Sequence, residues 1–172
     1  MNHEVLPYIR LVHILFGVIW AGANIFLTLF IYPAAQKSGK AGNEFLKILP
    51  KTNNMPMFMT ITGLITIVSG IWMIYYLSGG SYISYFYSSF GKCILAGGIC
   101  TIIAFLNGIL VIRQSGLKLD KIGMELEKKN EAPTIEVLKR IDVLSNRIIK
   151  ATAIEAILLF AATLLMAIGR YI

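Results

Sequence analysis

The chain has 172 residues, of which 56% are hydrophobic, and its mean hydropathy is +0.71. This composition excludes an ordinary soluble domain, in which apolar residues make up roughly 45–50% of the chain. The formal net charge is +7, from 16 lysines and arginines against 9 aspartates and glutamates. Such an excess can reflect either nucleic-acid binding or the topology of a membrane protein. The positions of the basic residues along the chain distinguish these two explanations.

Four apolar runs approach the length that a helix needs to cross a bilayer, about 20 residues. They cover residues 11–32, 57–77, 93–112 and 151–169, and we expect Pro33 and the Gly39/Gly42 region to end the first of them. Ala21-Gly22-Ala23 resembles a signal-peptide cleavage site, but the apolar run continues beyond it, which favours a retained first helix. The sequence therefore predicts an all-α, multi-pass protein of the cell membrane, with one integral membrane domain over residues 1–172 and a bundle of four transmembrane helices.

The basic residues lie mostly on one side of these runs. The segment between the first and second runs carries four of the 16 lysines and arginines, and the segment between the third and fourth carries nine. Only Arg10, Lys92 and Arg170 belong to the opposite side. The positive-inside rule then places both segments in the cytoplasm and both termini outside. Topology accounts for the net charge, so we expect contact with the lipid bilayer and no nucleic-acid partner.

Residues 114–150 form the only sizeable polar segment, which we predict to be a charged helical loop in the cytoplasm. Residues 117–129 and 134–149 both have helical patterns, separated by Ala132-Pro133. In the second helix the apolar residues recur every three or four positions, as expected for one apolar stripe. This helix is either an extension of the fourth span or a docking surface for a partner subunit.

Polar residues within the spans fall at two depths, counted at about 1.5 Å per residue. His13, Met73, Lys92 and Met166 share a level in the outer half of the membrane. Asn24, Asn107 and Glu155 share a level in the inner half. Because polar side chains are costly in lipid, both groups are expected to face the interior of the bundle.

His13 has two interpretations. It can simply hydrogen-bond a carbonyl, a lipid headgroup or water, or it can be the axial ligand of a b-type haem, since histidine is a common ligand of haem iron. Gly17, one turn along the same face, would let a flat macrocycle lie close to the helix. No other span contains a histidine, so Met73, Met166 or a neutral Lys92 would have to be the sixth ligand, or the iron stays five-coordinate.

Lys92 and Glu155 also allow two interpretations each. Lys92 can extend to the outer interface in the usual way of membrane lysines, or it can face inward and ligate iron or neutralise a porphyrin or quinone oxygen. Glu155 can be a hydrogen-bonded polar anchor between helices, or it can be a catalytic carboxylate that takes up protons from the cytoplasm.

These residues also resemble those of a known group. A first-span histidine, Trp20-Ala21-Gly22, the sequence FIYPAA at the end of the first run and Lys92 at the start of the third are similar to the HemJ-type protoporphyrinogen oxidases and the copper-resistance protein D group. The closing AATLLMAIGRY resembles their last helix. The resemblance implies that His13 and Lys92 are essential residues and that His13 is associated with haem b. This sequence departs from the pattern later in the third span, where members of the group often have a histidine and this chain has Asn107 nearby.

The sequence thus leads to a primary hypothesis and two alternatives. The first is an integral membrane b-type haem protein with a redox role, a possible oxidoreductase that exchanges electrons with a porphyrinogen or a quinone. The second is a non-catalytic transmembrane subunit of a larger respiratory or other membrane complex, or a homo-oligomer. Transport of copper or a small solute rests on the copper-resistance resemblance alone, because the methionines are too scattered to form a copper path.

Overall fold

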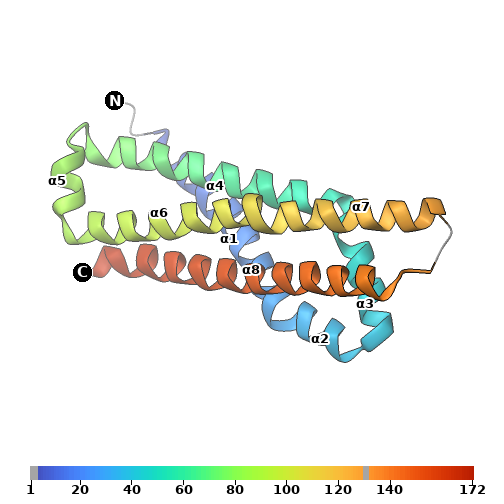
Figure 1. Cartoon of the computed structure of the whole chain (residues 1–172). Helices are drawn as coiled ribbons and strands as arrows, with labels where there is room; N and C mark the ends of the chain where they lie inside the picture. The colour runs from blue at the N-terminus through green and yellow to red at the C-terminus, as the bar shows by residue number, and fades with distance from the viewer. Residues whose placement is uncertain (1–3, 130–131) are drawn as a thin grey trace.

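The computed structural model describes residues 4–129 and 132–172, which are almost entirely helical and contain no strand. Four helical stretches are long and apolar enough to cross a membrane. The start of α1, the short helix α5 and the C-terminus gather at one end of the molecule, and α3, the end of α7 and the start of α8 lie at the other (Figure 1). The predicted all-helical architecture with four helices able to span a membrane is confirmed.

The first stretch continues past Pro33 and ends at the second of the two places where its end was expected. It consists of α1 (Leu6–Phe26), the π-helical turn η1 (Leu27–Ile31) and α2 (Tyr32–Lys37). A proline inside an α-helix removes one backbone hydrogen bond and crowds the preceding turn. Here the wider π turn precedes Pro33, which occupies the first turn of α2, where a missing N–H costs little. The stretch ends before Gly39, in the Gly39/Gly42 region that the sequence indicated, and the φ of Gly39, 56°, is left-handed.

The second stretch bends before it enters the apolar region. It consists of α3 (Gly39–Ile48), the 3₁₀ segment η2 (Leu49–Asn54) and α4 (Met55–Ser78). Asn53 and Asn54 have φ of 49° and 52°, a left-handed conformation that asparagine tolerates better than most residues. The bend separates the short helix α3, which packs on α2, from the long helix α4.

The third and fourth stretches form a long helical hairpin, and they confirm the two helices predicted within residues 114–150. Their elements are α5 (Tyr82–Tyr87), α6 (Ser89–Asn107), the π-helical turn η3 (Gly108–Arg113), α7 (Gln114–Lys129), α8 (Ile135–Ile168) and the 3₁₀ turn η4 (Gly169–Tyr171). Helix α7 continues α6 and η3 without a break, and α8 starts well before its apolar part. Lysine, glutamate and leucine are good helix formers, so the helices do not stop where the charged residues begin. The predicted break at Ala132-Pro133 is present.

The four stretches pack through small and polar residues. Helix α1 packs mainly on α4 and α6 mainly on α8, while α1–α8 and α4–α6 contacts join the two pairs. Large apolar side chains remain exposed, as Ile157 on α8 does at 68%. The buried polar residues include five hydroxyl-bearing residues of the apolar helices: Thr62, Thr66, Ser69, Thr101 and Thr152. This arrangement reverses that of a soluble protein and is typical of helices that associate in lipid.

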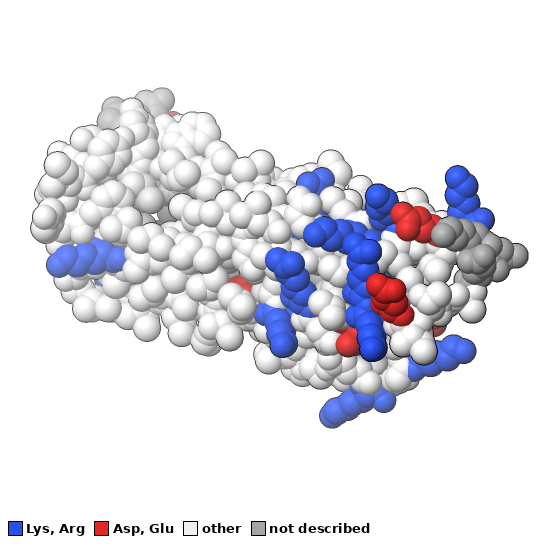
Figure 2. Space-filling view, viewed as in Figure 1, with Lys and Arg blue, Asp and Glu red and all other residues white. Residues whose placement is uncertain are grey.

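Charge is distributed unevenly along the molecule. Lysine and arginine side chains gather over the end that carries α7 and the start of α8, while most of the remaining visible face is uncharged (Figure 2). An apolar body with basic residues concentrated at one end is consistent with a multi-pass membrane protein in contact with lipid.

Candidate functional site

His13 on α1 is held against the backbone of α4. Its Nδ1 lies 2.8 Å from the carbonyl oxygen of Thr66 and 3.3 Å from the hydroxyl of Ser69. A carbonyl oxygen can only accept, so Nδ1 carries the proton and donates it to Thr66, which leaves the lone pair on Nε2. The close approach depends on Gly70, because a Cβ atom there would lie 2.9 Å from Cε1 of the ring. The imidazole is therefore fixed in orientation and in tautomer.

Gly17 lies on the same face of α1, and it also packs on α4. A Cβ atom at Gly17 would meet the methyl group of Thr66 at 3.4 Å. Gly17 thus lets α1 and α4 approach each other, and its contact is with a neighbouring helix instead of open space beside the ring. Together with His13 and Gly70 it forms what we call the α1–α4 seam.

The other residues expected at the outer level are divided between the two helix pairs. Met73 follows Thr66 by seven residues on α4, which places it on the face that carries the seam, about two turns from Thr66. Met166 on α8 packs instead against α6, where a Cβ atom at Gly97 would lie 3.1 Å from its Cε and Cγ atoms. Lys92 is exposed near the start of α6. The described hydrogen bonds of His13 are made to Thr66 and Ser69, and none is made to Met166 or Lys92.

Glu155 on α8 is buried in the middle of the bundle and makes a hydrogen bond across two helices. Its side chain is 4% exposed, and Oε1 accepts a bond of 3.1 Å from the indole Nε1 of Trp20. Trp20 on α1 is itself only 2% exposed and packs edge-on against Phe105 of α6, with ring centroids 6.0 Å apart. A Cβ atom at Gly63 of α4 would lie 3.1 Å from the indole ring. All four long helices therefore contribute to the surroundings of this pair.

The two asparagines of the predicted inner level lie beside this pair. The amide of Asn24, buried on α1, donates to the carbonyl of Trp20 at 3.0 Å. The amide of Asn107, at the end of α6, donates to the carbonyl of Ala151 on α8 at 2.8 Å, one turn from Glu155. Asn24, Asn107 and Glu155 thus come together with Trp20, and we call these four residues the inner cluster.

Two π-helical turns border the inner cluster. The turn η1 begins soon after Asn24, and η3 begins directly after Asn107. Both turns pack on α8, and a Cβ atom at Gly108 of η3 would lie 3.3 Å from Oε2 of Glu155. A π turn widens a helix locally and often marks a functional position. The second carboxylate oxygen therefore faces an irregular stretch of backbone.

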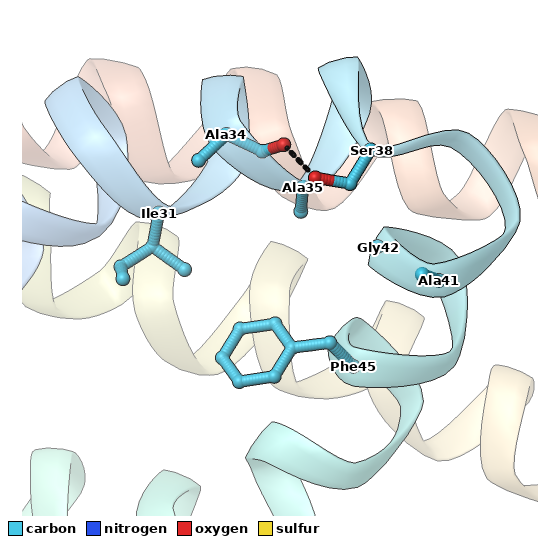
Figure 3. A pocket seen from close by; sticks show the side chains of 7 residues that line it. All are labelled: Ile31, Ala34, Ala35, Ser38, Ala41, Gly42 and Phe45. Carbon is cyan, nitrogen blue, oxygen red and sulfur yellow. Dashed lines mark hydrogen bonds between the residues drawn. The ribbon is translucent and has the colours of Figure 1, made fainter.

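A cavity of about 240 Å³ lies where α2 folds back on α3, apart from these residues. Ile31 and Phe45 line it from opposite elements, and the hydroxyl of Ser38 donates to the carbonyl of Ala34 at 2.9 Å (Figure 3). A Cβ atom at Gly42 would overlap the backbone of Ala35, so glycine is needed for this turn. The lining includes no ionisable side chain, so we assign the cavity a structural role.

The donor chemistry at His13 fits a haem iron. Within residues 4–129 and 132–172, no three histidine, cysteine, aspartate or glutamate side chains gather as a metal-binding group. Haem needs only one or two protein ligands, because the porphyrin supplies the in-plane nitrogens. An imidazole with Nδ1 bonded to a carbonyl and Nε2 free has the form in which metal-binding histidines are commonly held.

No protein-family model, curated protein or solved structure matches this chain. The resemblance to the HemJ-type and copper-resistance group therefore stays a prediction that rests on the motifs around His13 and Lys92.

Trp20 is the residue of the inner cluster that sequence reasoning missed, because it was considered as part of the Trp20-Ala21-Gly22 motif. A signal for its actual role was present. Trp20 stands four residues before Asn24, on nearly the same face of the helix. A buried indole N–H needs an acceptor, and Glu155 is the only acidic residue in the four apolar runs.

Proposed function

We propose that this protein is an integral membrane b-type haem protein with a redox role, with His13 as the axial ligand. The observation that carries the proposal is the hydrogen bond from Nδ1 to the carbonyl of Thr66, which presents a fixed imidazole with a free Nε2 lone pair. When bound, haem supplies one-electron transfer. The protein supplies the ligand, its orientation and an apolar environment.

Further residues of the outer level support the same role. Met73 shares the α4 face on which His13 packs, so it is our proposed second ligand. Met166 is engaged with Gly97 on the other helix pair. We assign to Lys92, which is exposed at the start of α6, the role of neutralising a carboxylate of a porphyrin or the oxygen of a quinone.

Glu155 is our proposed proton carrier. Oxidation of a porphyrinogen or a quinol releases protons together with electrons, and a buried carboxylate can accept and pass on a proton. Trp20 fixes one oxygen of Glu155 by a hydrogen bond, while the other faces Gly108 and the widened turn η3. With the basic end of the molecule in the cytoplasm, as the positive-inside rule predicts, Glu155 lies in the inner half of the membrane.

The experiment that tests the proposal is a visible spectrum of the purified full chain after reconstitution with haem. We expect a Soret band with α and β bands on reduction, and we expect His13→Ala to lose them. His3→Ala, which removes the other histidine of the chain, is the matched control and should keep the bands. A colourless wild-type protein, or bands that survive His13→Ala, would refute the haem proposal.

A non-catalytic subunit of a larger membrane complex is the second candidate. It is favoured by the hairpin of α7 and the first half of α8, which extends beyond the apolar spans and exposes apolar side chains there. Those exposed residues are Leu117, Met124, Ile135, Leu138 and Val143. Recovery of a stable complex from native membranes, with a colourless purified chain, would favour this function over the first.

A further inference from the structure

A second cavity, of about 510 Å³, lies between α8 and the junction of α6 with the π turn η3. One wall is a single face of α8, on which lining residues recur every three or four positions from Val143 to Ile154. The other wall consists of Asn107 and Val111, the second of which belongs to the π turn η3. Asn107 and Ala151, which share a hydrogen bond, both line the cavity, so it adjoins the inner cluster without including Glu155.

Two basic side chains line this cavity. Arg147 and Lys150 stand three residues apart on α8, so their side chains are neighbours on the helix surface. Both are exposed, and neither forms an ion pair with any residue in the part of the chain that the structure describes. The amides of Asn107 and Asn146 add further hydrogen-bonding groups. The polar part of the cavity is therefore suited to an anion.

The remainder of the lining is aliphatic and leads into the apolar span. Val111 lines the wall opposite α8, and Ile154 lies about one turn beyond Lys150 in the direction of the membrane interior. Ile154 is 54% exposed on the outer surface of the bundle, where lipid chains would lie. A small soluble anion would use the basic part and leave this apolar strip uncovered, at a cost in buried area. An amphiphile covers both.

We propose that this cavity binds an acidic phospholipid, with the phosphate on Arg147 and Lys150 and an acyl chain along Val111 and Ile154. An acidic phospholipid is chosen first because its phosphate complements the two basic side chains. The basic residues also lie at the edge of the apolar span, where a lipid headgroup would be, and the aliphatic residues lie further into the span. The site is independent of haem binding at His13. It bridges α8 and η3, so the bound lipid stabilises the contact between the third and fourth stretches.

Positive-inside topology alone would explain basic residues at this end, and the experiment has to separate the two causes. The matched control is Lys139→Gln/Arg140→Gln, which removes the same charge from exposed positions of α8 outside the cavity. The test variant is Arg147→Gln/Lys150→Gln. If the double variant does not fold, the lipid affinities of the single variants Arg147→Gln and Lys150→Gln are compared with those of the wild type and the control.

The measurement is native mass spectrometry of the full chain in detergent, titrated with phosphatidylglycerol, with phosphatidylcholine and with inorganic phosphate. We expect phosphatidylglycerol to bind at least tenfold more tightly than phosphatidylcholine. The test variant should lose about 30-fold, since each basic residue near a membrane surface contributes roughly fivefold, and the control should keep wild-type affinity. Equal losses in both variants, absence of a preference between the lipids, or displacement of the bound lipid by inorganic phosphate would each overturn the proposal.

Discussion

The α1–α4 seam and the inner cluster both place polar groups inside the bundle, but they hold them in different ways. His13 in the seam is half-buried and bonds to the backbone and a hydroxyl of one neighbouring helix. Glu155 in the inner cluster is buried and bonds to a side chain of another helix, in surroundings that all four long helices share. The first arrangement orients a ring and leaves one nitrogen free, while the second joins helices. We therefore expect substitutions in the seam to affect ligand binding and substitutions in the inner cluster to affect stability.

The largest effect is expected from Glu155→Ala. It leaves the buried indole N–H of Trp20 without an acceptor and opens a cavity, which together should lower the free energy of unfolding by about 2–4 kcal/mol. The measurement is thermal or denaturant unfolding of the detergent-solubilised protein. Glu155→Gln is the control, because its amide oxygen can still accept from Trp20 and most of the stability should remain. If the two variants are equally unstable, the hydrogen bond is not what holds the cluster.

A smaller effect is expected from Gly70→Ala in the seam. The added Cβ would lie 2.9 Å from the imidazole, so His13 has to move, at a cost of about 1–2 kcal/mol, and its bond to Thr66 is lengthened. The haem spectrum should shift or weaken along with the melting temperature. Gly98→Ala on α6 is the control, because its Cβ would meet nothing within 4 Å, and it should be neutral or slightly stabilising. A Gly70→Ala spectrum identical to wild type would remove the link between this contact and the ligand.

His13→Ala should remove haem binding with little effect on stability, whereas Glu155→Ala should mainly lower stability. Loss of one partly exposed hydrogen bond costs about 1 kcal/mol or less, so the variant should fold and melt close to wild type. The same preparation should have lost its haem bands. A large drop in melting temperature would show that the seam, like the inner cluster, is chiefly structural.

The smallest effect concerns α5, outside both regions. The hydroxyl of Tyr85 is buried without a described partner, and burial raises the pKa of this phenol above its ordinary value. Tyr85→Phe should therefore raise the free energy of unfolding by roughly 0.5–1 kcal/mol. Because the folded state favours the protonated phenol, wild type should lose stability as the pH rises above about 10, and the variant should lose less. Tyr87→Phe, at a residue 76% exposed, is the control and should change neither quantity.

Composition and periodicity predicted most of the fold, because long apolar helices with charges at one end have few alternatives. The helix break at Ala132-Pro133 was also predictable, because proline disfavours the helical conformation of the residue that precedes it. The end of the first stretch before Gly39 was predicted too, whereas the π turn before Pro33 was not. The helices over residues 117–129 and 134–149 were predicted as well, but not that they continue directly into the third and fourth apolar spans.

The candidate site was predictable in part. Depth counting placed Asn24, Asn107 and Glu155 at one level, and the structure brings all three into the inner cluster. The partner of Glu155 was not predicted, since which helices are neighbours cannot be counted from one sequence. For the same reason the contact of Gly17 with Thr66 of α4 was not predicted.

The central claim is that His13 ligates haem through a free Nε2, and imidazole rescue tests it most directly. His13→Ala should fold without the reduced α and β bands, and added imidazole should restore them by occupying the vacated place beside Thr66 and Gly70. A matched addition to the wild type should leave its reduced spectrum unchanged. Bands that persist in His13→Ala without imidazole, or a folded variant that imidazole fails to restore, would contradict the account.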